Sequence, residues 1–412
     1  MKILGIICEY NPFHNGHAYQ IQKAREETGS DALVCVMSGN YVQRGEAAIT
    51  DKWTRTRMAL CGGADLVVEL PTLFAMSGAE SFARSGIQLL AQAGVQTVSF
   101  GCETENLPLM RRIAGVLSEE PEEYQELLRK YLDGGESFAR SRACALSLCL
   151  GADGEEAGRI LEQPGAILGI EYLKAMKEFP MQTCLIRRRG EEHRDEKTLG
   201  QTASASAIRA AIRRGDFPAE AVPPQTAAAW NLARQSGRTR PRQDFFEECL
   251  YTRLVRMEPW RIAETPELAE GLENRILEQT SIYRTWEEVV SRIVSRRYPA
   301  SRIRRILMNL CLGISLETRY RTGWEEGPAY LRILGIGPRG EALLSRIKKE
   351  SALPVLTNPA GQLKNLTGTA RNQFLEEVKY TDLYMLSLPQ KSARIRGLEY
   401  REPIMKKTEK NR

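Results

Sequence analysis

EYNPFHNGH, at residues 9–17, is the segment of this chain from which both its fold and its chemistry can be predicted. It follows an apolar run at residues 3–8 and precedes a helical pattern that begins near Ala18. A strand, a turn with glycine and a helix, in this order, present free N–H groups to an anion at the carboxyl edge of a sheet. His14 and His17 are two of only three histidines, and their spacing lets both imidazoles reach one phosphate. The competing interpretation is a pair of solvated loop histidines.

The sequence around this segment alternates apolar runs with helical patterns. Apolar runs lie at residues 3–8, 32–37, 64–70 and 96–100, and helical patterns lie at residues 18–27, 52–61 and 77–91. This alternation predicts an α/β fold with a parallel sheet that helices cover on both faces. Three prolines in residues 218–224 indicate a linker, so we predict one domain at residues 1–217 and a second at 218–412. The second reads as mainly helical, with a small α/β portion at residues 329–357.

Composition excludes several classes of protein. Apolar residues make up 42% and charged residues 27% of the 412 residues, as in ordinary globular proteins. No apolar run approaches the roughly 20 residues that span a bilayer, and the first residues read directly into a strand. We therefore expect a cytoplasmic protein without a membrane partner. Nine cysteines form no C-x-x-C pair, so we predict no metal site.

The H-x-G-H spacing resembles the signature of the nucleotidyltransferase superfamily, and the wider string EYNPFHNGH is similar to the tRNA(Met) cytidine acetate ligase family. This resemblance implies a Rossmann-like nucleotidyltransferase domain that binds ATP, with Mg²⁺, and activates acetate as an acetyl-adenylate. It further implies transfer of the acetyl group to N4 of the wobble cytidine of elongator tRNA(Met), which the second domain would bind. Two alternatives stay open, namely a nucleotidyltransferase acting on a small molecule and a non-catalytic tRNA-binding homologue.

The same resemblance implies roles for the residues of the first loop. His14 and His17 would be catalytic and would donate hydrogen bonds to charge that builds on the α-phosphate, as neutral or as protonated imidazoles. Asn11 and Asn15 could instead form turns or cap a helix, and we predict that Phe13 packs in the core. The nucleotide would contact the end of the strand, the loop and the start of the helix: Ile7, Cys8, Glu9, Tyr10, Asn11, Pro12, Phe13, His14, Asn15, Gly16, His17, Ala18, Tyr19 and Gln20.

Three later segments complete the nucleotide site that the resemblance implies. Gly101, in the string FGCE, would lie against ATP, with a plain turn glycine as the alternative. Arg188, at the end of another strand, would contact a phosphate through its guanidinium. The string TASASAIR at residues 202–209 resembles a phosphate-binding helix start, and it supplies the candidates Ser204, Ser206 and Arg209. Helix capping by one serine is the alternative there.

The loop after the second strand offers further candidates. Gln43, Arg44 and Glu46 would border the group that is adenylated, with a solvated polar loop as the alternative. One segment departs from the family, which carries P-N-N-I-L-G where this chain has PGAILG at residues 164–169. An asparagine that would bind the nucleotide is thus replaced within Gly165-Ala166. Either a backbone group or another side chain takes over, or nucleotide binding is weaker.

Arginine-rich segments in the second half of the chain favour a polyanionic partner. The net charge is +6, and arginines gather at residues 234–242 and 292–305. Such clusters could hold an RNA backbone, and solvated helix faces are the alternative.

Overall fold

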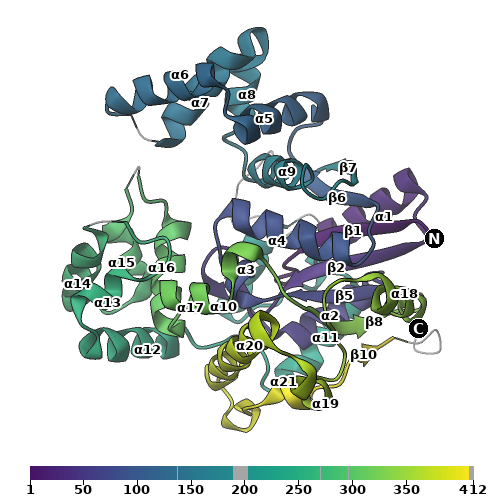
Figure 1. Ribbon diagram of the computed structural model, residues 1–412. Coiled ribbons are helices and arrows are strands. Elements are labelled where there is room, and N and C mark those ends of the chain that lie inside the picture. Colours follow the sequence, from purple (N-terminus) through teal and green to yellow (C-terminus); the bar gives the residue numbers. More distant parts are fainter. Residues whose placement is uncertain (137, 189–202, 270, 296, 408–412) are drawn as a thin grey trace.

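The computed structural model describes residues 1–136, 138–188, 203–269, 271–295 and 297–407. A twisted sheet lies at its centre, and two groups of helices extend from it in different directions (Figure 1). One group comes from the first half of the chain and the other from the second half.

The sheet is built around β1, which provides the strand before the histidine loop. Five parallel strands follow the order β5-β2-β1-β6-β7, where β1 is Ile3–Cys8, β2 is Ala32–Ser38, β5 is Leu66–Leu70, β6 is Thr97–Cys102 and β7 is Gln182–Arg187. The connections run outward from β1 in both directions, so the strand order reverses between β1 and β6. In open α/β sheets this reversal opens a crevice at the carboxyl ends of the strands, where ligands bind. The predicted α/β class is confirmed.

The second half of the chain adds the other edge of this sheet. β8 (Leu331–Ile336) pairs antiparallel with β5, and both β9 (Val355–Leu356) and β10 (Met405–Lys406) pair parallel with β8. The predicted small α/β portion therefore exists and continues the first sheet. The sheet is mixed at this edge. The sequence made no prediction of how this portion would pair, because pairing across more than 260 residues of chain leaves no local signal.

Helices cover both faces of the sheet, as predicted. One face packs against α1 (Asn15–Thr28), α2 (Lys52–Cys61), α10 (Ala205–Arg214) and α11 (Pro224–Gln235). The other face packs against α4 (Ala79–Gln92), α9 (Pro164–Ala175) and α18 (Gly340–Glu350). Because both faces are covered, all seven residues of β2 are buried, which explains its uninterrupted apolar run.

The first group of helices lies between β6 and α9. It comprises α5 (Leu107–Glu119), α6 (Glu122–Asp133), α7 (Phe138–Leu150) and α8 (Gly154–Ile160). The second group comprises α12 (Gln243–Arg256), α13 (Pro259–Ala263), α14 (Leu272–Ile282), α15 (Trp286–Ile293), α16 (Ala300–Leu312) and α17 (Leu316–Arg321). Within the described ranges, none of the helices has the length and apolar character that crossing a membrane requires.

The second group contacts the sheet through the short hairpin of β3 (Tyr41–Val42) and β4 (Glu46–Ala47). Gly45, in this hairpin, has a φ of +77°, and a Cβ there would lie 2.4 Å from the backbone nitrogen of Arg305 in α16. Arg305 also donates a hydrogen bond to the carbonyl of Gln43. The hairpin and α16 therefore touch at backbone level, which only a glycine allows.

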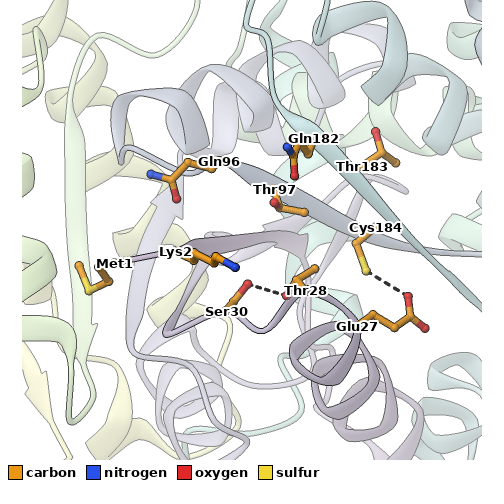
Figure 2. Close-up of a pocket in the computed structure, with 10 residues that line it drawn as sticks. All are labelled: Met1, Lys2, Glu27, Thr28, Ser30, Gln96, Thr97, Gln182, Thr183 and Cys184. Atoms are coloured by element: carbon orange, nitrogen blue, oxygen red, sulfur yellow. Dashed lines mark hydrogen bonds between the residues drawn. The ribbon is translucent and has the colours of Figure 1, made fainter.

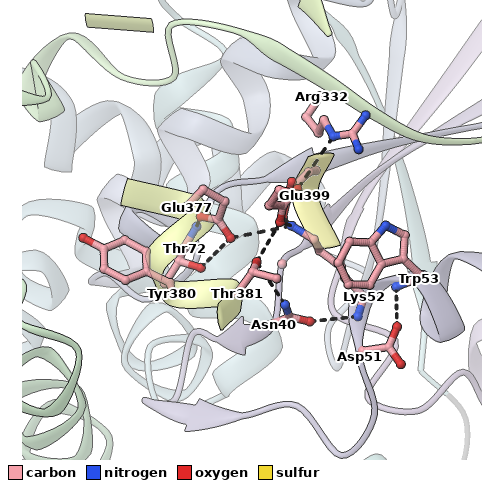
Figure 3. A network of polar contacts seen from close by, with 12 residues as sticks. Asn40, Asp51, Lys52, Trp53, Thr72, Arg332, Glu377, Tyr380, Thr381 and Glu399 are labelled. Atoms are coloured by element: carbon pink, nitrogen blue, oxygen red, sulfur yellow. Dashed lines mark hydrogen bonds and ion pairs between the residues drawn. The ribbon is translucent and has the colours of Figure 1, made fainter. Parts of the chain in front are cut away.

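A buried ionic network joins the C-terminal helices to the sheet (Figure 3). The Lys52 ammonium, in α2, donates to Glu69 of β5 and to Glu399 of α21 (Leu398–Arg401). Glu377, in α20 (Gly368–Leu386), lies 3.8 Å from the same nitrogen and accepts hydrogen bonds from Thr72, at the start of α3 (Thr72–Ala75). Among the described residues this is the one acidic cluster with metal-like spacing, and the ammonium already fills it.

Candidate active site

His14 and His17 hold each other in place at the start of α1. His14 is the N-cap residue, and its Nδ1 accepts a hydrogen bond from the Gly16 backbone N–H at 3.1 Å. In return, His17 Nδ1 accepts one from the His14 backbone N–H at 3.2 Å. The two rings are stacked with their centroids 3.7 Å apart. This reciprocal cap explains why histidines occur three residues apart at this helix start.

The hydrogen bonds determine which ring nitrogens carry protons. Because both Nδ1 atoms accept from N–H groups, each neutral ring carries its proton on Nε2. Burial, together with the positive charges of Arg188 and Arg209, lowers the pKa of His14 to about 4. Burial, His14 and Arg188 lower the pKa of His17 well below its usual value. In the protein without nucleotide, two neutral imidazoles therefore offer two neighbouring Nε2–H donors at neutral pH.

The rest of the loop supports this pair. Tyr10 and Phe13 are fully buried, and the Tyr10 ring lies edge-on to both Phe13 and His17, with centroids 4.8 Å away in each case. The side chain of Asn11 accepts from the Ile49 backbone N–H. Asn11 is thus tied to the fold through its oxygen, while its buried Nδ2 has no hydrogen-bond partner. The packing role predicted for Phe13 agrees with its complete burial.

The other predicted contacts of this segment lie on either side of the loop. Ile7 and Cys8 are at the end of β1, and Asn15, Ala18, Tyr19 and Gln20 are in the first turns of α1. Asn15 donates to the Glu220 carbonyl at 2.9 Å, and Gln20 reaches the Ser99 carbonyl in β6 at 3.5 Å. Glu9 accepts the Gln43 backbone N–H at 2.9 Å, which links the loops after β1 and β2.

Two of the predicted arginines approach the histidine pair from separate elements. Arg209, in α10, donates to the carbonyl of Asn11 at 3.0 Å. Arg188 follows β7, and its side chain runs along Gly101 of β6, where a Cβ would lie 3.2 Å from the arginine Nε. Gly101 therefore makes room for Arg188. The structure thus brings Gly101, Arg188, Arg209 and both histidines to the crevice between β1 and β6.

The predicted serines have local roles. Ser204 is the N-cap residue of α10, where its hydroxyl accepts from the Ala207 N–H at 3.2 Å and lies 2.9 Å from the Ser206 hydroxyl. Both serines are exposed, so their hydroxyls stay accessible from solvent. Thr202, the first residue of this predicted segment, belongs to the range 189–202, which lies outside the described residues.

Arg55 is a central residue that the sequence analysis missed. Its buried guanidinium donates to the carbonyl of Glu9 at 2.8 Å and to that of Ser38 at 2.9 Å. It also donates to the carbonyls of Gly39 and Thr50. One side chain thereby joins the loops that follow β1 and β2. An arginine within a helical pattern carries no local signal for this role, because its partners come from three other segments.

Glu103 is the second residue that was missed. Its carboxylate accepts the backbone N–H groups of Gly165 and Ala166, both at 3.1 Å, and lies 3.5 Å from Nη1 of Arg188. The segment that departs from the family pattern therefore meets a carboxylate. The string FGCE placed Glu103 beside Gly101, but only folding shows what it contacts.

Several arginines of the two predicted basic clusters form ion pairs or hydrogen bonds within the protein. Arg302 and Arg305 bind Glu267, and Arg304 binds Glu287, so three guanidiniums of the second cluster are engaged inside the helical group. Arg238, from the first cluster, pairs with Asp51 and Glu402. Other arginines of the two clusters are exposed, namely Arg234, Arg240, Arg292 and Arg297. Further exposed basic residues lie near the end of α12 and in α13, where the Arg261 guanidinium lies 5.1 Å from the ring centroid of Trp260.

A cavity of about 570 Å³ lies away from this site (Figure 2). Lys2, Thr97 and Gln182 line it at the amino ends of β1, β6 and β7. None of the predicted site residues lines this cavity. Because ligands of open α/β sheets bind at the carboxyl ends of the strands, the histidine crevice is the better candidate for chemistry.

Comparisons with known proteins agree with this geometry. A family model described as HIGH Nucleotidyl Transferase matches residues 1–398. The tRNA(Met) cytidine acetate ligase of Acetivibrio thermocellus is 37% identical over 98% of this chain and its own full length, and that of Caldanaerobacter subterraneus is 38% identical with the same coverage. The crystal structure of Thermotoga maritima TmcAL bound with alpha-thio ATP is similar, with a TM-score of 0.90 and 30% identity over 98% of this chain and 99% of that one.

Proposed function

The chain belongs to the HIGH nucleotidyltransferases and, within them, to the tRNA(Met) cytidine acetate ligase family, and we infer that it is an ATP-dependent ligase. We propose that it forms N4-acetylcytidine at the wobble position of elongator tRNA(Met), with acetate as the acid and the cytoplasm as its compartment. The observation that carries this proposal is the pair of stacked histidines that cap the start of α1, with Arg188 and Arg209 beside them.

The first proposed step joins acetate to ATP. An acetate oxygen attacks the α-phosphorus, a new O–P bond forms, and the bond to pyrophosphate breaks. Negative charge builds on the α-phosphate oxygens as this happens, and preorganised donors in a site that excludes water stabilise such charge. His14 and His17 supply two such donors, because each ring accepts a backbone N–H at Nδ1 and keeps Nε2–H as a donor.

The second proposed step transfers the acetyl group. The N4 amine of cytidine attacks the acetyl carbonyl, a C–N bond forms, and the C–O bond to AMP breaks. One N4 proton is lost to water. Gln43, Arg44 and Glu46 follow β2 beside Glu9, so they remain candidates for contact with the acetyl group.

The described residues fit a triphosphate in their charge and hydrogen-bonding groups. Arg188 and Arg209 place positive charge beside the histidines, and the N-terminus of α1 adds N–H groups. We propose that ATP contacts residues 7–20 together with Gly101, Arg188, Ser204, Ser206 and Arg209. Mg²⁺ would arrive with the phosphates, since Lys52 fills the acidic cluster noted above.

We further propose that residues 1–217 supply the catalytic site and that residues 218–412 bind the tRNA. Exposed side chains near the end of α12 and in α13 support this division. Three of them are basic and two are apolar: Arg253, Val255, Arg256, Trp260 and Arg261. Val255 is 88% exposed and Trp260 is 59% exposed. Exposed aromatic rings beside guanidinium groups are suited to stacking with unpaired RNA bases.

The test is mass spectrometry of nucleosides from an elongator tRNA(Met) transcript after incubation with the protein, ATP, Mg²⁺ and acetate. We expect N4-acetylcytidine only when ATP and acetate are both present, with AMP and pyrophosphate released in equal amounts. A transcript with uridine at the wobble position should stay unmodified. If the intact protein binds the transcript and forms no acetylcytidine, the proposal is wrong.

The same assay tests the histidines. We expect His14→Ala and His17→Ala each to slow turnover by roughly 100-fold or more, because each removes one donor to the developing charge. Binding of the tRNA, measured by filter retention, should be unchanged. Gln22→Ala, on an exposed position of the same helix, is the matched control and should retain full activity.

A further inference from the structure

A single carboxylate connects the start of α9 with Arg188. Glu103, just beyond β6, is 16% exposed at its side chain. One of its oxygens accepts the Gly165 N–H and the other accepts the Ala166 N–H. The same carboxylate pairs with Arg188, whose Nη1 lies 3.5 Å from Oε1. Glu103 thus caps a twelve-residue helix and holds a guanidinium at the same time.

Only glycine at position 165 permits this arrangement. A Cβ built on Gly165 would lie 2.4 Å from one Glu103 oxygen and 2.8 Å from the other. Both distances are shorter than real Cβ contacts, so any other residue there would displace the carboxylate. The backbone of Gly165 is helical and does not itself require glycine. The reason for glycine is therefore the space that the carboxylate occupies.

Arg188 leads from this carboxylate toward the histidines. Its side chain passes along Gly101, where a Cβ would lie 3.2 Å from Nε and 3.3 Å from Cγ. Its positive charge also contributes to the lowered pKa of His14 and of His17. Arg188 is 42% exposed, and a long exposed side chain has many rotamers unless a partner restricts them.

We propose that Glu103 is a positioning residue of the nucleotide site. It orients Arg188 beside the histidine pair, and Gly165 leaves the space that its carboxylate needs at the start of α9. This inference rests on the proposed function, because it takes ATP as the ligand. The Glu103 carboxylate also accepts two helix N–H groups, so it neutralises only part of the positive charge of Arg188. The rest of that charge is available to a phosphate.

Glu103→Gln distinguishes this positioning role from mere repulsion between the Glu103 carboxylate and the triphosphate. If Glu103 were only a like charge near the triphosphate, its neutralisation would tighten ATP binding. If it orients Arg188, the loss of the charged partner weakens ATP binding, and we expect the Kd for ATP to rise about tenfold, as for loss of one charge-assisted hydrogen bond. Isothermal titration of the full-length protein with ATP and Mg²⁺, without acetate or tRNA, measures this. Glu105→Gln is the matched control, because Glu105 pairs with exposed Arg187 at 3.4 Å and should leave the Kd unchanged.

Gly165→Ala tests the same contact between Glu103 and the start of α9 by changing the helix instead of the carboxylate. Its Cβ displaces the carboxylate, so the Kd for ATP should rise by a factor similar to that of Glu103→Gln. Gly158→Ala, in α8 with nothing within 4 Å of the added Cβ, is the control and should bind ATP normally. The double variant Glu103→Ala/Gly165→Ala should bind ATP no more weakly than Glu103→Ala alone, because both changes remove one interaction.

The outcomes distinguish the inference from the proposed function. A lowered Tm with an unchanged Kd in Glu103→Gln and Gly165→Ala would show that Glu103 only caps α9, and a tighter Kd would show that it is only a neighbouring charge. Either result overturns the inference. A wild-type protein that binds ATP and makes no acetylcytidine would refute the proposed function, and the ratio of Kd values would still decide the role of Glu103. A wild-type protein that does not bind ATP overturns both.

Discussion

His14 and His17 show how one local motif sets both geometry and protonation. Each ring accepts a backbone N–H at Nδ1, so the cap of α1 itself determines which nitrogen faces the crevice as a donor. An imidazolium could not accept these hydrogen bonds, because both of its nitrogens are protonated. The helix cap and the nearby arginines therefore favour the same neutral state.

This neutral state predicts an unusual titration in the protein without nucleotide. The pKa of His14 is about 4 in the folded protein, against 6.5 for an unfolded chain. We expect its ring Cε1–H signal in NMR to keep the chemical shift of a neutral imidazole from pH 8 down to about pH 5.5. A midpoint near pH 6.5 would contradict the buried, capped geometry.

The same shift affects stability with a definite sign. Between the two pKa values the unfolded chain binds a proton that the folded protein does not, so the stabilising contribution is complete above pH 6.5 and is lost as pH falls through 4. The loss amounts to at most about 3 kcal/mol for His14. Urea unfolding of the wild type and of His14→Gln at pH 7.5 and pH 4.5 measures the difference, and the wild type should lose more stability.

At the scale of elements, Lys52 shows how helices from distant parts of the chain are joined to the sheet. Burial alone would lower its pKa, but Glu399, Glu69 and Glu377 outweigh this effect, so the pKa is raised and the ammonium stays charged. Burial raises the pKa of Glu69 to about 8, although Lys52 opposes this shift. The network therefore depends on Lys52 and, at Glu399, also on Arg332, whose Nε lies 3.9 Å from the carboxylate.

Removal of this ammonium should be strongly destabilising. Lys52→Met leaves the buried carboxylates Glu69 and Glu377 without their cation, and we expect a loss of about 3–5 kcal/mol in the free energy of unfolding, measured with urea. Lys23→Met is the control, because Lys23 pairs with Glu26 on the surface and should cost less than about 1 kcal/mol. A similar small loss for both variants would show that the network does not hold α20 and α21 to the sheet.

The contact between Gly45 and α16 makes a second prediction about elements. Gly45→Ala adds a Cβ only 2.4 Å from the backbone of Arg305, whereas Gly29→Ala, also at positive φ, adds one with nothing within 4 Å. We expect Gly29→Ala to cost about 1 kcal/mol from backbone strain alone, and Gly45→Ala to cost clearly more. Hydrogen exchange should also rise in α16 of Gly45→Ala. Equal costs without such a change would mean that the hairpin and α16 are not in close contact.

At the scale of the whole molecule, the sheet draws its strands from both halves of the chain. β8 covers the edge of β5, and Glu377 and Glu399 meet Lys52 from C-terminal helices. A sheet edge left without its neighbour exposes unpaired N–H and C=O groups. The candidate site and the C-terminal strands therefore share one sheet, although the proposed division of tasks falls near residue 218.

This arrangement predicts the behaviour of a fragment. Residues 1–217 expressed alone would expose β5 and leave Lys52 without two of its carboxylates, so we expect no cooperative thermal unfolding transition and a tendency to aggregate. Calorimetry of the fragment and of the full chain provides the measurement. A fragment that unfolds in one cooperative transition would show that the C-terminal strands contribute little to the sheet.

Local patterns were sufficient for the elements and for the first part of the site. The apolar runs and helical periodicities identified the parallel strands and most of the helices, because each pattern reflects burial along one short segment. The string EYNPFHNGH located the histidine pair for the same reason, since strand, loop and helix start are contiguous in the chain. Gly101, Arg188 and Arg209 came from the family resemblance, and folding places them at the same crevice.

The remaining features required the fold, because they depend on residues far apart in the sequence. The antiparallel edge of β8, the carbonyls that Arg55 joins, and the cation that fills the cluster around Lys52 are each set by packing between distant segments. The clearest case is Gly165. From the sequence, Gly165-Ala166 was only a departure from the family pattern, and only the folded chain shows the Glu103 carboxylate in the space where a side chain at position 165 would be. Periodicity and turn residues can be recognised within one short segment of the chain. The contact between Gly165 and Glu103 exists only after two distant segments have packed together.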